Sequence, residues 1–293
     1  MMFTTTKSRS FLKGSTMALV AGMLLGAGPG AIGAASAEET LDRLKEQGFV
    51  RIAIANEPPW TAVNSDGSVT GAAPEVARAV MKKLGVDELL ASVSEYGAMI
   101  PGLQAKRFDM VTAGLFIKPE RCAAVIFSQP DLCDGEAFAV KKGNPLSIKT
   151  YADLAAHKTV RVGAPGGGTE ERLALEAGVP RDRVIVVPDA QSGVNMLQDG
   201  RIDVYALPFL SISDLLAKAD DPNLEMVAPI ANTPIYCAGA AFNKNDVALR
   251  DAYDVALAEM KASGEFDKIV EPFGFNAELA KMQTSENLCA GTQ

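Results

Sequence analysis

Two charged loops contain the residues of this chain whose chemistry is best suited to binding or catalysis. Arg121 follows the loop from Gly114 to Pro119. Its guanidinium is permanently charged and offers a planar fork of donors, which suits a carboxylate at a closed site. Glu57 directly follows a β-branched run and precedes two prolines that hold its loop rigid. Taken alone, either residue could be an ordinary charged side chain on a surface loop.

A glycine-rich segment from Gly163 to Thr169 lies between a predicted strand and a predicted helix. Its backbone N–H groups and the helix N-terminus can face an anion. It is not a phosphate loop, because the lysine and the spacing of that motif are missing. We expect Thr169 to be the N-cap of the helix and its hydroxyl to be available for a ligand as well.

Features that would indicate metal or catalytic chemistry are missing from the sequence. The single histidine, His157, stands in a polar stretch far from any cysteine, and there is no C-x-x-C motif. No Ser-His or Cys-His arrangement is visible, and Glu57 and Asp203 are the only carboxylates placed to act as an acid or base. We therefore expect no metal, no cofactor and no enzyme activity.

The N-terminus has the pattern of an export signal. Lys7, Arg9 and Lys13 precede an apolar run from Met17 to about Gly28, and Ala35-Ser36-Ala37 resembles a cleavage site. Removing residues 1–37 would leave a chain with a net charge of about −11, which disfavours nucleic acid and anionic lipid as partners. No later stretch is long and apolar enough for a membrane span. We expect a soluble periplasmic protein.

Four cysteines in a chain destined for an oxidising compartment indicate disulfides. The sequence allows three pairings. We expect Cys122 to pair with Cys133 across a short loop, and Cys237 to pair with Cys289 near the C-terminus.

Strand and helix patterns alternate along two parts of the chain. The first part has strands at 50–55, 92–95 and 108–113, with a helix opened by Pro74 and closed by Gly85 and another at 98–106. The second has helices near 151–156, 169, 192–198 and 212–219 and strands at 159–163, 184–187 and 203–207. This alternation predicts two α/β units, each built on a mostly parallel sheet. Extended runs near 134–138 and 236–242 would join them as crossing strands, with a ligand cleft between the two units.

The segment Gly97 to Pro130 contains R-F-D, P-E-R and F-S-x-P, and it resembles the signature region of the amino-acid-type periplasmic binding proteins of ABC importers (solute-binding family 3). The resemblance extends over most of the chain. More narrowly, Asn56-Glu57-Pro58-Pro59-Trp60, Glu95-Tyr96-Gly97, Gly114-Leu115-Phe116 and Gly166-Gly167-Gly168-Thr169 resemble the ectoine and hydroxyectoine binders. The narrow resemblance departs at Trp60, where phenylalanine is expected.

The resemblance assigns roles to residues of one site. Glu57 would face the cationic end of the ligand, and Trp60, Tyr96 and Phe116 would surround a delocalised cation, whose attraction to aromatic faces is roughly 0.5 to 2 kcal/mol each. Its carboxylate would lie between Arg121 on one lobe and Gly168 and Thr169 on the other. Amino-acid binders usually place an aspartate after the strand at 203–207, but Pro208 stands there. A free α-ammonium group would then lack its partner, which favours a cyclic amidinium carboxylate such as ectoine.

These implications complete the expected picture. The fold would be the two-lobed periplasmic-binding-protein (type II) α/β fold, with lobe 1 formed by residues 38–135 and 239–293 and lobe 2 by residues 136–238. The protein would be a monomer that delivers ectoine or hydroxyectoine to the membrane subunits of an ABC importer. The alternatives are binding of another carboxylate solute, such as an opine or a proline derivative, and a periplasmic dehydratase built on the same fold.

Overall fold

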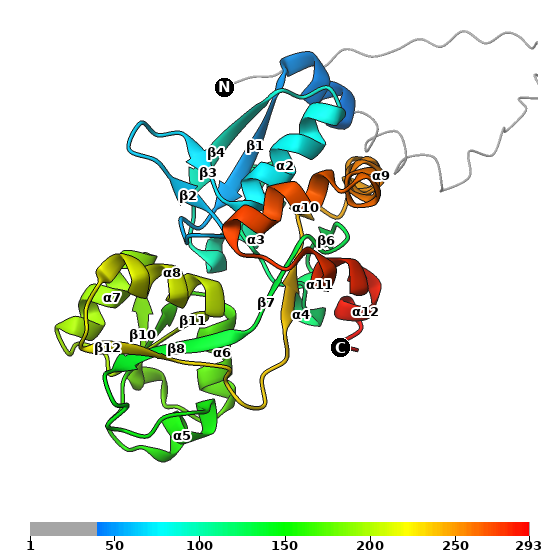
Figure 1. Ribbon diagram of the computed structural model, residues 1–293. Coiled ribbons are helices and arrows are strands. Elements are labelled where there is room, and N and C mark those ends of the chain that lie inside the picture. Colours follow the sequence, from blue (N-terminus) through cyan, green and yellow to red (C-terminus); the bar gives the residue numbers. More distant parts are fainter. Residues whose placement is uncertain (1–39, 293) are drawn as a thin grey trace, which may run out of the picture.

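The computed structural model describes residues 40–292, so the expected export signal at 1–37 lies outside the described range. Two five-stranded sheets organise this part of the chain, with strand orders β4-β1-β5-β14-β6 and β10-β9-β11-β8-β12. We call the units built on them lobe 1 and lobe 2. Figure 1 shows the two lobes as separate bodies linked by β7 and the extended segment beside it. This confirms the predicted two-lobed α/β fold.

Lobe 1 begins with a helix over residues 40–47 and contains both ends of the described chain. Its strands are β1 (Phe49–Ile54), β2 (Ala62–Val63), β3 (Val69–Thr70), β4 (Glu88–Val93), β5 (Met110–Val111), β6 (Ile126–Phe127) and β14 (Ala241–Phe242). Its other helices are α2 (Ala72–Lys83), α3 (Tyr96–Gln104), α4 (Pro119–Cys122), α9 (Val247–Ser263), α10 (Glu265–Val270), η2 (Glu271–Phe273), α11 (Ala277–Met282) and α12 (Ser285–Cys289).

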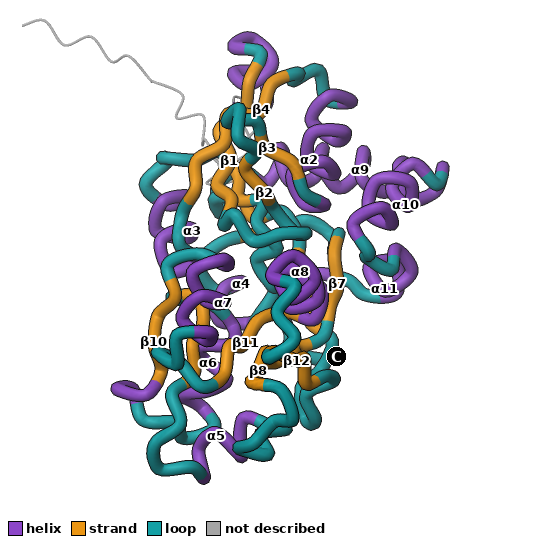
Figure 2. Tube along the Cα trace, turned by 60° about the vertical axis from the view of Figure 1, so that its left-hand side comes forward, coloured by secondary structure: helices purple, strands orange, loops and turns teal. Residues whose placement is uncertain are grey.

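Lobe 2 is one continuous stretch of chain. Its strands are β8 (Glu136–Lys141), β9 (Val162–Pro165), β10 (Val184–Val187), β11 (Val204–Pro208) and β12 (Leu224–Val227). Its helices are α5 (Tyr151–Ala156), α6 (Thr169–Glu176), η1 (Arg181–Arg183), α7 (Ala190–Gln198) and α8 (Phe209–Ala219). In Figure 2 the strands of this lobe, in orange, have helices packed around them. Apolar side chains fill both faces of the sheet, and this double burial explains the apolar run around Val162.

Each sheet contains one strand that runs against its neighbours. β14 is antiparallel to β5 and β6, and β8 is antiparallel to β11 and β12, while β1 and β9 pair in parallel with the strands on both sides. The reversed strands are those that the chain enters directly after crossing between lobes. The crossings themselves, β7 (Leu132–Asp134) and β13 (Tyr236–Ala238), form a separate antiparallel pair.

The predicted disulfide pairing is wrong. The structure joins Cys122 to Cys289 and Cys133 to Cys237. Cys133 and Cys237 lie directly opposite each other in the β7–β13 ladder, with Cα atoms 4.0 Å apart. The predicted pairing of Cys289 with Cys237 required helix α12 to lie beside the crossing strands. Instead, α12 packs beside α4, where Cys289 reaches Cys122.

Several predicted elements agree with the structure at both ends, whereas others are shorter or shifted. Helix α5 and strand β10 have the predicted limits. Strand β5 covers only Met110–Val111, because its pairing with β1 and β14 is confined to these residues. Among the described residues, no helix has the length and apolar character that a membrane span requires.

Candidate ligand-binding site

All seven residues predicted to bind a ligand line one cavity between the lobes. Lobe 1 contributes four loops and helix ends that follow its strands, and lobe 2 contributes the N-terminus of α6 and the end of β11. The lining residues are Glu57, Trp60, Tyr96, Gly114, Phe116, Arg121, Gly168, Thr169, Glu170 and Pro208. Because strands of both sheets end here, residues far apart in sequence meet in one place.

Glu57, which is expected to face the cationic end of a ligand, is buried. Its Oε1 accepts a hydrogen bond of 2.7 Å from Ser211 Oγ on helix α8, and Tyr96 Oη lies 3.3 Å from its Oε2. Burial raises the pKa of Glu57 to about 8, with a further increase from the nearby Glu170 carboxylate, while the bonds from Ser211 and Tyr96 oppose the rise. A cation placed beside this carboxylate would favour its ionised form.

An aromatic wall stands next to Glu57. The Trp60 indole meets Phe116 edge-on at 5.5 Å and Phe275 at 4.7 Å, measured between ring centroids. Phe116 in turn stacks on Tyr236 at 5.3 Å. The indole fits because Gly114 has no side chain: a Cβ there would lie 2.4 Å from Trp60 Cε3. Trp60 Nε1 is buried and has no hydrogen-bond partner among the described residues, so it remains available as a donor.

Arg121 reaches the cavity from the short helix α4. Its Nη1 donates to Phe116 O at 2.9 Å in lobe 1, and its Nη2 donates to Gly167 O at 3.2 Å in lobe 2. Burial lowers the pKa of Arg121, and the Glu170 carboxylate partly offsets this effect. A guanidinium has five N–H donors, so two backbone contacts leave others free to bind a carboxylate.

The start of α6 differs from the prediction in one respect. Gly168, not Thr169, is the N-cap residue, and Thr169 is the first residue of the helix. The Thr169 hydroxyl therefore makes no capping bond, and its buried Oγ1 has no partner among the described residues. Because of this one-residue shift, the Thr169 hydroxyl does not cap the helix and is available to donate a hydrogen bond to a ligand in the cavity.

Pro208 ends strand β11 and is buried in the cavity lining. A proline has neither a charged side chain nor a backbone N–H. No carboxylate therefore reaches the cavity from this position. The acidic lining residues are Glu57 and Glu170.

The lobes touch around the cavity at several points. Besides the Ser211–Glu57 and Arg121–Gly167 bonds, Gly97 N donates to Gly166 O at 3.1 Å, and Arg172 forms an ion pair with Glu120. Gly167 also packs closely against Gly97, since a Cβ at Gly167 would lie 2.4 Å from the Gly97 backbone. The structure thus shows the lobes closed on the site.

A buried charged cluster beside the cavity was missed from sequence. Lys118 is 3% exposed, and its Nζ lies 3.9 Å from the centre of the Tyr236 ring. Burial lowers the pKa of Lys118 to about 8, and Glu170 and Glu136 across the lobe boundary oppose that effect. Burial raises the pKa of both glutamates. In sequence, Lys118 looked like part of an exposed charged loop.

Ser211 was also missed, although it lies one turn into the helix that follows Pro208. Its position at the helix start, next to a strand end that faces the cleft, is a signal that could have identified it. The described residues contain no group of three or more side chains able to hold a metal ion.

Comparison with known proteins supports the interpretation of the fold. The family model of bacterial extracellular solute-binding proteins, family 3, matches residues 50–277. A probable amino-acid ABC transporter periplasmic-binding protein from Sinorhizobium fredii (strain NBRC 101917 / NGR234) is 34% identical over 86% of each chain. The L-cystine-binding protein of Escherichia coli (strain K12) is 30% identical over 90% of this chain and 94% of its own.

Solved structures extend the comparison. The crystal structure of EhuB in complex with hydroxyectoine is 68% identical, with a TM-score of 0.85, and the match covers 86% of this chain and 98% of that one. An ancestral arginine-binding protein bound to arginine is 31% identical, with a TM-score of 0.68, over 77% of this chain and 98% of its own. This chain belongs to family 3 of the bacterial extracellular solute-binding proteins.

Proposed function

We propose that this protein binds ectoine or hydroxyectoine between its lobes and delivers it to an ABC importer. The observation that carries the proposal is the composition of the cavity lining: a carboxylate and an aromatic wall, a guanidinium and a helix N-terminus, and Pro208 where an amino-group partner would stand. The likeness to the EhuB–hydroxyectoine complex supports the same ligand class.

The binding mechanism follows from the positions of the charges. The delocalised cation of the solute lies against Trp60 and Phe116 with Glu57 beside it, and each aromatic face contributes roughly 0.5 to 2 kcal/mol. The solute carboxylate accepts donors from Arg121 and from Thr169 at the start of α6. Closure of the lobes removes water, which strengthens both charge contacts.

The moving units that we propose are residues 38–135 with 239–293 and residues 136–238. The first boundary falls between β7 and β8, and the second falls directly after β13, before β14. We further propose that export by the segment 1–37 places the protein in the periplasm, where it meets the importer. Its relatives are described as periplasmic-binding proteins, which supports this location.

Isothermal titration calorimetry of the full mature chain tests the ligand. We expect micromolar or tighter binding of ectoine and hydroxyectoine and little response to glutamine, histidine or arginine. The reverse ranking would contradict the proposal. Binding of an opine or a proline derivative in preference to ectoine would point to another carboxylate solute.

A dehydratase activity has one observation in its favour, because burial raises the pKa of Glu57 into the range of a general acid. One structural neighbour is an ancestral amino-acid-binding protein described as a precursor of cyclohexadienyl dehydratase, 28% identical with a TM-score of 0.70. We propose that Glu57 serves binding rather than turnover, since Ser211 and Tyr96 already engage both of its oxygens. Incubation with prephenate or arogenate should therefore yield no product.

A further inference from the structure

Helix α4, which carries Arg121, is a short segment. It spans only Pro119–Cys122, has no buried residue, and has no side-chain hydrogen bond at its N-cap, Lys118. A four-residue helix gains little stability from its own hydrogen bonds, so tertiary contacts must hold it in place. Within α4, the core of lobe 1 contacts Cys122, which is only partly buried.

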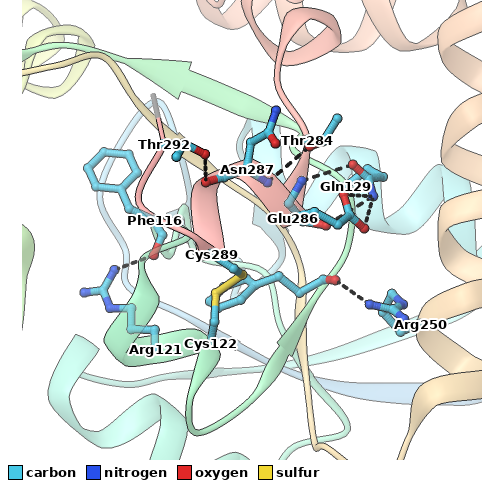
Figure 3. The surroundings of a disulfide bond; sticks show 12 residues. Phe116, Arg121, Cys122, Gln129, Arg250, Thr284, Glu286, Asn287, Cys289 and Thr292 are labelled. Atoms are coloured by element: carbon cyan, nitrogen blue, oxygen red, sulfur yellow. Dashed lines mark hydrogen bonds between the residues drawn. A yellow bond between two sulfur atoms is a disulfide. The ribbon is translucent and has the colours of Figure 1, made fainter.

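The Cys122–Cys289 disulfide ties this helix to the C-terminal helix α12. Figure 3 shows the bond beside Arg121, whose guanidinium points away from the disulfide toward Phe116. Cys122 directly follows Arg121 in the chain, so a restraint on the Cys122 backbone also restrains the backbone that bears the guanidinium. The Cα atoms of the two cysteines are 5.7 Å apart.

Helix α12 is itself fastened to lobe 1. Gln129 Nε2 donates to Ser285 Oγ at 3.1 Å and to the Glu286 carboxylate at 3.2 Å, and Gln129 Oε1 accepts from Ser285 N at 3.2 Å (Figure 3). Leu288, next to Cys289, is 1% exposed. The disulfide therefore connects α4 to an anchored element rather than to a loose chain end.

We propose that the Cys122–Cys289 disulfide is a positioning device for Arg121, which holds the guanidinium in the geometry that binds the solute carboxylate. The proposal rests on the proposed function, in which Arg121 makes that contact. Without the disulfide, α4 samples more positions, and binding must then restrict them. Such a loss of preorganisation weakens affinity without removing any group that touches the solute.

A double-mutant cycle in the full mature chain tests this role. Hydroxyectoine affinity is measured by titration calorimetry for the wild type, Cys289→Ser, Arg121→Ala and the combined variant. We expect Cys289→Ser to weaken binding about tenfold in the wild-type background and less than twofold in the Arg121→Ala background, because the disulfide acts through Arg121. A general loss of stability would weaken binding equally in both backgrounds.

Two controls keep the result interpretable. Cys237→Ser breaks the other disulfide, which joins the crossing strands β7 and β13 and does not involve α4. Any effect that it has on affinity should persist when Arg121 is replaced. The paired variant Cys122→Ala/Cys289→Ala leaves no free thiol and replaces Cys289→Ser in the cycle if that variant misfolds. A native circular dichroism spectrum and a melting temperature above the assay temperature establish that each variant is folded.

Each outcome decides one question. Unchanged affinity in a folded variant that lacks the Cys122–Cys289 bond, or an equal loss in the Arg121→Ala background, would overturn the positioning role. Failure of the wild type itself to bind hydroxyectoine would instead refute the proposed function.

Discussion

Replacement of Ser211 by alanine removes the hydrogen bond that joins helix α8 of lobe 2 to Glu57 of lobe 1. The bond is 2.7 Å long, and both side chains are buried. Its formation requires the lobes to be closed, since the two residues belong to different lobes. In an open form, water would solvate Glu57 instead, so the substitution affects mainly the closed, solute-binding form.

The size of the effect follows from the chemistry of the bond. A hydrogen bond to a charged group contributes about 1.5 to 3 kcal/mol, and removing one partner leaves a buried acceptor short of a donor. At about 1.4 kcal/mol per tenfold change, Ser211→Ala should weaken solute binding roughly 10- to 100-fold. Ser211→Thr keeps a hydroxyl at the same position and should stay close to the wild type.

The pH dependence of binding gives a second readout. In the closed form the pKa of Glu57 is about 8, and a cationic solute group requires the ionised carboxylate, so binding to the closed form should strengthen with pH up to about 8 and then level off. Because the Ser211 bond opposes the rise in that pKa, its removal should move the plateau to higher pH. Titration calorimetry with hydroxyectoine between pH 6 and 9 measures both effects. Wild-type affinity and an unmoved plateau in Ser211→Ala would refute the reasoning.

Three further predictions concern other residues. Arg121→Ala should weaken solute binding by more than about 2 kcal/mol, since the buried carboxylate loses its cationic partner; calorimetry showing unchanged affinity would mean that the carboxylate lies elsewhere. Burial raises the pKa of Asp131 to about 7, so its contribution to stability is fully present below its unfolded-state pKa and is lost as pH rises to 7. Between pH 4 and 7, urea unfolding should show that the free energy of unfolding of the wild type falls with rising pH relative to that of Asp131→Asn, by at most about 1.4 kcal/mol per pH unit. Parallel pH dependences of the two proteins would contradict this. Cys133→Ser opens a covalent loop of about 100 residues and should lower the free energy of unfolding by up to about 4 to 5 kcal/mol; an unchanged urea midpoint would argue against it.

The predicted ligand-binding residues line one cavity because each of them lies at or near the end of a regular element. Glu57 follows β1, Tyr96 begins α3 and Thr169 begins α6, and strand ends in two α/β units must converge at the cleft. Local patterns therefore placed these side chains close together without any knowledge of distances.

The missed features depend on contacts between distant segments. Ser211 reaches Glu57 only because the lobes close in one relative orientation, which no local pattern encodes. Lys118 is buried and contacts Tyr236 of β13, which is distant in sequence. The disulfide pairing failed for the same reason: the path of the last helices decides which cysteine meets Cys122, and the periodicity of short helices such as α12 says nothing about where they pack.

The β7–β13 pair has a mechanical consequence. Its ladder joins the two crossing strands, and the Cys133–Cys237 disulfide locks one rung of it, so neither strand can slide or rotate independently of the other. Twisting one lobe about the long axis of the molecule would shear this rung, whereas bending across both strands leaves it intact. The joint between the lobes should therefore bend more readily than it twists.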